Sequence, residues 1–408
     1  MGFTAGWRLD RVTDLAANAD RRSIRGGMKS GESIGVRASL RRINLAGFIF
    51  SSSGALFLLF PVYLYQIGSS PVEIGLVAGL MRISSLIARP VAGRLLDRFG
   101  RRPVIACGAL LGIFAILSLF AFHTLSTIFL AMRILQGVSA ALVDSGLGAV
   151  VADLSPPAAR AQVFAMYTVW LTLPGGIMPA VGEVIARHVG FLPLFGAAAL
   201  ALALFLVVFR RLPETMRSTQ EGPPSGWGLT AAAPTAFLGV VLVGLVFGVS
   251  SVFVPVAPIA AKAGRVGLFF FAYFMGLIGV RLGGGLGLTW LSRPAVITPA
   301  YGLMILGLAL LPFGESAWLL FLVGLCCGAG HGSIIPVMYA LVLSGIARAR
   351  RGWAVALMAA AFDTGVILGT MGLGLVAEWT GYRGVFAVAA IAVAAGASVG
   401  HLWGRRQL

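Results

Sequence analysis

Twelve long apolar stretches follow one another along this chain, and each is long enough to cross a lipid bilayer. A helix needs about 20 residues to cross the hydrocarbon core. The stretches are continuous rather than alternating, which favours helices over a transmembrane β-barrel. The sequence therefore predicts an all-α membrane protein with twelve transmembrane helices. The predicted spans are residues 44–66, 73–95, 103–122, 126–150, 161–186, 190–209, 234–258, 267–290, 295–313, 317–345, 353–377 and 384–403.

The charge content agrees with a membrane protein. Only 11% of the 408 residues are charged, whereas soluble domains carry about 25%. The net charge of +17 would also suit a nucleic-acid-binding protein, but the basic residues lie in short connectors rather than along one face. The three cysteines lie inside apolar runs and form no disulfide or metal-ligand pattern. We therefore expect no nucleic-acid partner, no metal and no cofactor.

The distribution of basic residues predicts the orientation in the membrane. With the N-terminus in the cytoplasm, the tail, the cytoplasmic connectors and the C-terminus hold 23 Lys and Arg residues, against 4 in the opposite connectors. Positively charged connectors stay on the cytoplasmic side. We expect a multi-pass protein of the bacterial inner membrane with both termini in the cytoplasm.

Two polar segments divide the chain. Residues 1–42 contain no apolar signal-peptide region and predict a basic cytoplasmic tail that touches anionic lipid. Both Met1 and Met28 remain candidate start sites. Residues 210–233 are rich in Pro, Gly, Ser and charge and predict a cytoplasmic linker. The remaining segments, 43–209 and 234–408, each hold six predicted spans and form the expected N-terminal and C-terminal bundles.

An internal repeat relates the two bundles. Residues 88–105 align with residues 280–297 at a shift of 192, and residues 190–195 resemble residues 381–386 at nearly the same shift. Two six-helix, pseudo-symmetric halves are what a transporter that alternates about a central site requires. The aligned pairs are Arg89 with Arg281, Gly93 with Gly285, Arg101 with Arg293, and Asp97 with Thr289.

The connector between the second and third spans carries a distinctive motif, which reads Gly93-x-x-x-Asp97-Arg98-x-Gly100-Arg101-Arg102. It resembles the signature of the major facilitator superfamily, and the resemblance covers the chain after about residue 43. In the fourth span, Arg133-x-x-Gln136-Gly137 resembles a motif of proton-coupled efflux members.

Three further segments extend the resemblance. Pro179-x-x-Gly182 keeps part of the antiporter motif, with Met178 and Glu183 at positions where that motif has glycines. The segments Gly328–Pro336 and Ala361–Asp363 resemble bacterial sugar and drug efflux permeases. The resemblance implies the major facilitator fold and transport of a small molecule.

The motif residues predict a gate at the cytoplasmic end. Asp97 ends the second span, where its carboxylate can accept backbone N–H groups at the start of the eleventh span near Trp353, and the resemblance implies the same contact. We call these motif residues and Asp153 the gating cluster, which would hold the two halves together at this end while the cavity faces outward. Alternatively, the arginines only fix the topology. We expect Arg98, Arg101 and Arg102 to reach Asp153, which ends the fourth span.

Charged side chains inside the spans are costly and mark function or pairing by default. Counting depth along the helices suggests that Arg89 pairs with Asp144. It places Arg82 and Arg133 at a level that Glu183 can approach. It also places three groups near mid-membrane on spans eight, ten and eleven, namely Arg281, His331 and Asp363.

Asp363 is the residue that we expect to bind the coupling proton, because its charge state can follow the hydration of the cavity. Glu183, Asp144 and His331 are the other candidates for proton coupling. Alternatively, Asp363 and Arg281 form a permanent pair, and His331 is a hydrogen-bond donor in helix packing. The glycines near mid-membrane predict close approach of helices.

Together these features predict a secondary transporter that exports a small organic molecule in exchange for protons. The chain has no phosphate-binding loop for ATP. A facilitator or proton-coupled importer of the same fold, with structural acidic residues, is the alternative. A membrane-embedded enzyme or sensor would need a metal triad, a Ser-His-Asp set or an appended soluble domain, and none is found. We expect a monomer whose partners are protons, lipid and a small-molecule substrate, of an identity that the sequence leaves open.

Overall fold

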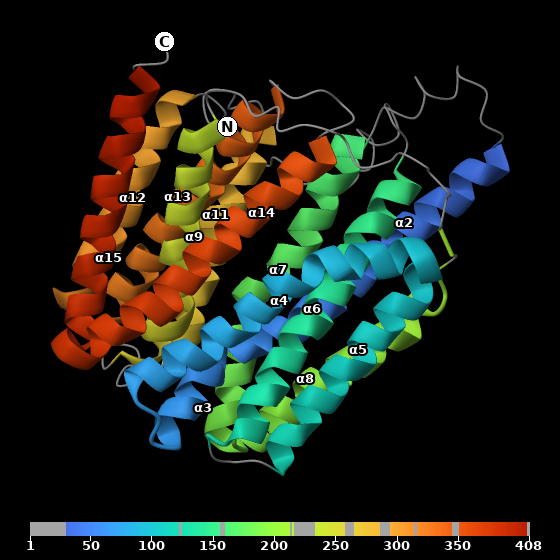
Figure 1. Cartoon of the computed structure of the whole chain (residues 1–408), viewed down its shortest axis with the longest axis horizontal. Helices are drawn as coiled ribbons and strands as arrows, with labels where there is room; N and C mark the ends of the chain where they lie inside the picture. The colour runs from blue at the N-terminus through green and yellow to red at the C-terminus, as the bar shows by residue number, and fades with distance from the viewer. Residues whose placement is uncertain are drawn as a thin grey trace, which may run out of the picture.

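A computed structural model describes residues 30–121, 125–155, 160–212, 214–215, 233–257, 265–285, 294–313, 316–344 and 351–405, and within them it contains helices and no strand. The N-terminal tail to residue 29, most of the expected linker, and Thr289 with Arg293 of the repeat lie outside the described residues. The structure is drawn in Figure 1.

The helices before the linker are α2 (Ser30–Leu56), α3 (Phe60–Gln66), α4 (Pro71–Phe99), α5 (Arg101–Leu117), α6 (Thr127–Leu154), α7 (Arg160–His188) and α8 (Phe191–Phe209). Those after it are α9 (Ala233–Val256), α11 (Val266–Gly285), α12 (Ile297–Leu310), α13 (Ala317–Ser344), α14 (Arg351–Ile367) and α15 (Leu373–Arg405), with a short π-helix at Leu368–Gly372. We call α2 to α8 the first group and α9 to α15 the second group.

Ten candidate spans in the described residues are long and apolar enough to cross a membrane, and Ile297–Phe313 is a shorter apolar helix. The last two predicted spans, 353–377 and 384–403, correspond to one 48-residue candidate, Ala354–His401. Its backbone is non-helical at Gly381, where φ is 67° and ψ is −178°. Gly190, the repeat mate of Gly381, also has a positive φ of 101° between α7 and α8. Both copies of the repeat therefore change direction at a glycine, which adopts such angles without strain.

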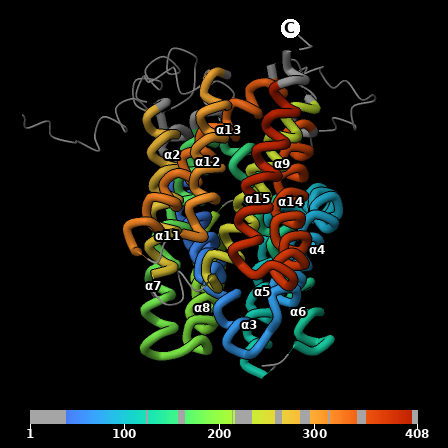
Figure 2. Tube along the Cα trace, turned by 90° about the vertical axis from the view of Figure 1, so that its left-hand side faces the viewer, coloured from blue at the N-terminus to red at the C-terminus, as the bar shows by residue number. Residues whose placement is uncertain are grey.

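Each group packs mainly within itself (Figure 1). Figure 2 is turned so that the second group faces the viewer, and α12 lies beside both α13 and α15. On α13, Gly324, Gly328 and Gly332 face α11, where an added Cβ would meet backbone carbonyl oxygens. Small residues four apart let two membrane helices approach closely, as the sequence predicts for this glycine-rich segment.

The two ends of the bundle differ. We call the end where α2 begins and α15 ends the terminal end, which is at the top of Figure 1, and the opposite end the distal end. A large hydrophobic core includes buried residues of both groups, among them Phe60 and Ile74 of the first and Phe253 of the second. A smaller core, which includes Ile43 and Phe209, belongs to the first group alone.

The groups approach each other most closely toward the distal end. A Cβ added at Gly75 on α4 would meet the carbonyl oxygen of Thr370, and one at Gly267 on α11 would meet the backbone of Ala180. At α4 the helix start is fixed by a capping box, in which Ser70 accepts from the amide of Glu73 at 3.3 Å and its own amide donates to the Glu73 carboxylate at 2.7 Å. Such caps satisfy the free N–H groups of the first helical turn.

Candidate functional site

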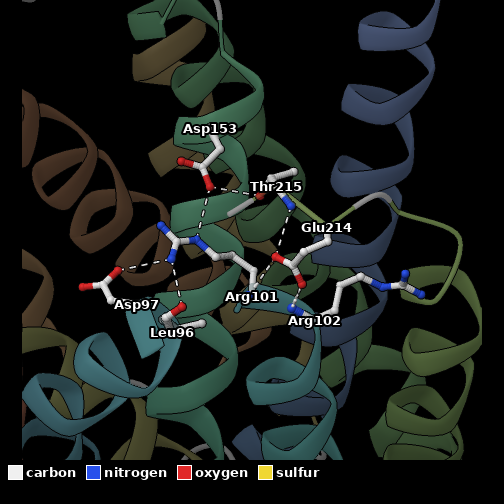
Figure 3. A network of polar contacts seen from close by, with 7 residues as sticks. All are labelled: Leu96, Asp97, Arg101, Arg102, Asp153, Glu214 and Thr215. Carbon is white, nitrogen blue, oxygen red and sulfur yellow. Dashed lines mark hydrogen bonds and ion pairs between the residues drawn. The ribbon is translucent and has the colours of Figure 1, made fainter. Parts of the chain in front are cut away.

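A polar network joins the ends of α4, α5 and α6 at the terminal end (Figure 3). Arg101, which is 8% exposed, lies at its centre. Its Nε donates to Oδ2 of Asp153 at 3.2 Å, and its Nη1 donates to the carbonyl of Leu96 at 2.9 Å and to Oδ1 of Asp97 at 3.2 Å. Gly100 precedes it with a φ of 91°, a left-handed conformation that favours glycine. Gly100 therefore makes the sharp turn between α4 and α5 that brings the Arg101 side chain to Asp153 of α6.

Two residues of this network were not predicted from the sequence. Glu214 lies beyond α8, and its carboxylate accepts from the amides of Arg101 and Arg102, each at 2.9 Å (Figure 3). Thr215 donates to Oδ2 of Asp153 at 2.9 Å. A carboxylate at the start of α5 satisfies free N–H groups and complements the positive end of the helix dipole. The available signal was an acidic residue directly after the basic end of the sixth predicted span.

The expected cytoplasmic gate is only partly assembled. The Asp97 side chain is 78% exposed, and its ion-pair partner in the described part of the chain is Arg101. The described residues show no contact of Asp97 with α14, and the side chains of residues 351–353 at the start of that helix lie outside the described residues. A Cβ added at Gly93 would meet nothing within 4 Å.

The three motif arginines also separate. Arg101 reaches Asp153, but Arg98 stacks over the ring of Phe99 at 5.2 Å, and Nη2 of Arg102 donates to the carbonyl of Arg210 at 2.7 Å. The prediction that all three reach Asp153 is therefore wrong for Arg98 and Arg102. The reason is local: α4 ends at Phe99 and α5 begins at Arg101, so the three side chains leave two different helices.

Two arginines of α4 contact an aspartate of the second group. Nη2 of Arg89 lies 2.9 Å from Oδ2 of Asp363 on α14, and Nη1 of Arg82 lies 3.8 Å from Oδ1. Asp363 is 2% exposed. Oδ2 has no aligned hydrogen bond within the described residues, so the contact with Arg89 is an ion pair without hydrogen-bond geometry.

The predicted pair of Arg89 with Asp144 is wrong. Asp144 is exposed and has no ion pair with a described residue, although it lies within electrostatic range of Arg89, Arg82 and Asp363. Depth counting along one helix fixes the level of a side chain but not the direction in which it points. Arg89 turns toward the other group.

The expected neighbours of Asp363 in its own group form a separate cluster. Nδ1 of His331 on α13 lies 2.7 Å from the hydroxyl of Tyr273 on α11, and both residues are buried. Arg281 lies within electrostatic range of Tyr273, Tyr339 and His331. In the described part of the chain it has no ion pair with Asp363, so the predicted Asp363–Arg281 pair is wrong.

Arg133 occupies an aromatic environment. Its Cζ lies 4.4 Å from the ring centroid of Phe60, a cation–π contact. Its guanidinium also donates to the side chain of Gln136 and contacts Sδ of Met81 at 3.6 Å. The motif spacing of Arg133 and Gln136 therefore places both on one face of α6, one turn apart.

Glu183 does not approach Arg82 or Arg133, so that expectation is wrong as well. Its Oε1 lies 2.7 Å from Nη2 of Arg187, and its Oε2 accepts from the amide of Gly267 at 2.8 Å. Glu183 lies in the second-last turn of α7 and Gly267 in the first turn of α11, so this contact joins the two groups at the distal end. The carboxylate meets the positive end of the α11 dipole.

Comparisons with known proteins agree with this geometry. The Quinolone resistance protein NorA of Staphylococcus aureus is 26% identical over 174 residues, which cover 43% of this chain and 45% of NorA. Multidrug resistance protein 1 of Bacillus subtilis is 32% identical over 166 residues, which cover 40% of this chain and 42% of that protein. The matched segment thus spans less than half the length of these relatives.

A solved structure extends the similarity to most of the chain. The inward-open xylose transporter XylE from E. coli superposes with a TM-score of 0.70 at 16% identity, covering 88% of this chain and 95% of XylE. The family model of the Major Facilitator Superfamily matches residues 43–294. This chain, a multi-pass membrane protein, is therefore a transporter rather than an enzyme and belongs to the Major Facilitator Superfamily.

Proposed function

We propose that this protein exports a small organic molecule across the bacterial inner membrane in exchange for protons. The observation that carries the proposal is the ion pair of Asp363 with Arg89 between the two groups. A buried carboxylate keeps its charge only beside a cation. Binding of a proton to Asp363 would remove its attraction to α4, and so would couple protonation to movement of one group against the other.

We further propose twelve crossing helices in two bundles, with the boundaries 43–209 and 234–408 and with residues 1–42 and 210–233 in the cytoplasm. Two observations support the count: the 48-residue candidate span divides at Gly381, and Ile297–Phe313 supplies one more apolar helix. At about 1.5 Å per residue, a 48-residue helix is more than twice the thickness of the hydrocarbon core. The bias of basic residues supports cytoplasmic termini in contact with anionic lipid.

The conformation fits an inward-facing state. The first-group residues of the shared hydrophobic core, the close approach at Gly75 and the Glu183 contact all lie toward the distal end, which would face the periplasm. At the terminal end, the Asp97 side chain is 78% exposed, and its ion-pair partner among the described residues is Arg101 of its own group. We propose that Asp97 caps α14 when the protein turns outward, while Arg101 and Asp153 hold the first group together in both states.

Transport by the purified full chain in proteoliposomes tests this function. A quinolone is the first probe, because a relative is a quinolone resistance protein. An acidic lumen drives uptake by a proton antiporter, whereas an acidic exterior drives uptake by a symporter. We expect quinolone uptake with the acidic lumen only, beyond that of protein-free liposomes. Asp363→Asn should lower it at least about tenfold.

Glu378→Gln is the matched control, because Glu378 is an exposed carboxylate on the same helical segment. It should transport like the wild type. Full gradient-driven uptake by Asp363→Asn would contradict the coupling role of Asp363. Uptake driven only by the acidic exterior would replace export with import.

A further inference from the structure

Arg281 is a cation in a predicted membrane span, and it has no ion pair with an anion among the described residues. Its Nε is buried and has no hydrogen-bond partner among the described residues, and the same residues offer it no ion pair. Its electrostatic neighbours are Tyr273, Tyr339 and His331, and none of these three residues carries a carboxylate. A charge at such a position is costly and marks a functional site by default.

The internal repeat shows which anion is missing. Arg281 aligns with Arg89 at a shift of 192, and Arg89 has Asp363 as its partner. The same shift carries Asp363 to Leu171 on α7, and the shift of 191 between Gly190 and Gly381 carries it to Thr172. Helix α7 packs against α11 as α4 packs against α14 and α15. The second copy of the pair has therefore kept its arginine and lost its carboxylate.

The acidic residues nearby are engaged elsewhere. Asp363 pairs with Arg89 and Arg82 of the first group, and Glu183 is bound to Arg187 and to the amide of Gly267. At least six residues from the ends of the spans predicted from the sequence, the described residues include four arginines and only two aspartates. The arginines are Arg82, Arg89, Arg133 and Arg281, and the aspartates are Asp144 and Asp363. The interior therefore carries an excess of positive charge.

Tyr273 and His331, two of the electrostatic neighbours of Arg281, belong to an aromatic cluster. The ring of His331 is 6.1 Å from that of Phe247 and 5.6 Å from that of Phe362, and Phe247 is 6.0 Å from Tyr273. These rings come from α9, α11, α13 and α14 of the second group. A guanidinium next to such rings suits a ligand that has an aromatic body and a carboxylate, because Arg binds carboxylates through two parallel hydrogen bonds.

We propose that the transported molecule is an aromatic carboxylate, and that Arg281 binds its anionic group while the partly exposed rings of Phe247 and Phe362 contact its rings. The inference rests on the proposed function and specifies its substrate class. The carboxylate of the ligand is the anionic partner of Arg281, as Asp363 is the anionic partner of Arg89.

Binding to the purified full chain by titration calorimetry tests this site. The probes are 2-naphthoate, 2-naphthamide and 2-naphthylmethylamine, which share one ring system and differ in charge. We expect 2-naphthoate to bind the wild type at least tenfold more tightly than the other two. Arg281→Met should weaken 2-naphthoate at least tenfold, and Arg281→Lys should weaken it less. Arg94→Met, which removes an exposed arginine of α4, should bind like the wild type.

The melting temperature provides an independent measurement. Because Arg281 is an unpaired interior cation, Arg281→Met should melt at or above the wild-type temperature, which also shows that the variant folds. A lower melting temperature would make Arg281 a structural residue and overturn the proposal. Absence of 2-naphthoate binding, equal binding to Arg281→Met, or preference for the amine would overturn it too.

Experiment can contradict the proposed transport and the proposed anion site independently of each other. Binding of 2-naphthoate that depends on Arg281, without gradient-driven uptake of this probe, supports the anion site and contradicts coupled transport. Gradient-driven uptake of the amine without 2-naphthoate binding supports transport and overturns the anion site.

Discussion

Nη2 of Arg89 lies 2.9 Å from Oδ2 of Asp363, and so a cation of the first group neutralises an anion of the second. Only 3% of the Asp363 side chain is exposed, against 29% for Arg89. Loss of the arginine leaves the carboxylate buried, whereas loss of the carboxylate leaves an arginine with partial access to its surroundings. The pair therefore matters more to Asp363 than to Arg89.

This asymmetry predicts unequal effects of the two single substitutions on stability. Removing one partner of a buried ion pair costs about 3–5 kcal/mol, and we expect Arg89→Gln to approach the lower end because Arg82 remains 3.8 Å away. Asp363→Asn should cost less. In the double variant no buried charge is left unpaired, so most of the loss should be recovered. Chemical unfolding of the four proteins in mixed micelles measures the coupling energy.

Arg94→Gln is the control for this cycle, since Arg94 is an exposed arginine on the same helix. It should leave the unfolding free energy within about 0.5 kcal/mol of the wild type. Additive effects of Arg89→Gln and Asp363→Asn would show that the two residues do not interact in the folded protein.

Much of the fold could be predicted from the sequence because membrane helices are long, apolar and locally encoded. The repeat in the sequence pairs Gly190 with Gly381, and both have a positive φ in the structure. The family followed from the motif around Asp97. The limit appears at Ala354–His401, where one long helical segment in the structure replaces two predicted spans.

The partners of the buried charges could not be predicted in the same way. The sequence gives the level of Arg89 in its helix, but its rotation and the packing of the two groups decide that it meets Asp363 rather than Asp144. Glu183 was placed near Arg133, yet it caps α11 on the other group. Contacts between segments that lie far apart in sequence depend on tertiary packing, which the residue pattern of a single helix does not reveal.

The Glu214 cap predicts a local effect at the start of α5. Its carboxylate accepts from the amides of Arg101 and Arg102, each at 2.9 Å. Glu214→Ala should lower the unfolding free energy by about 1 kcal/mol and speed hydrogen exchange of these two amides. Exchange mass spectrometry on peptides covering residues 100–106 reports this, with Glu378→Gln as the control. Unchanged exchange would mean that water or another group replaces the cap without loss.

The contact of Glu183 with the Gly267 amide predicts how the distal end is held shut. Among the described residues it is the hydrogen bond that joins α7 to α11, and it sets a full negative charge at the positive end of α11. Glu183→Gln keeps an acceptor but removes the charge, so we expect the distal ends of the two groups to separate more often. Spin labels can be placed at the exposed positions 189 and 313 in a background without other cysteines. Double electron–electron resonance should then show a larger fraction of molecules with a long distance between the two labels.

Arg187→Gln separates this effect from the loss of a surface ion pair. It removes the other partner of Glu183 but leaves the carboxylate on the Gly267 amide. Exposed i,i+4 pairs contribute only about 0.3–0.5 kcal/mol, so its distance distribution should resemble that of the wild type. If Arg187→Gln opened the distal end as far as Glu183→Gln does, the ion pair within α7, rather than the cap on α11, would be what holds the two groups together.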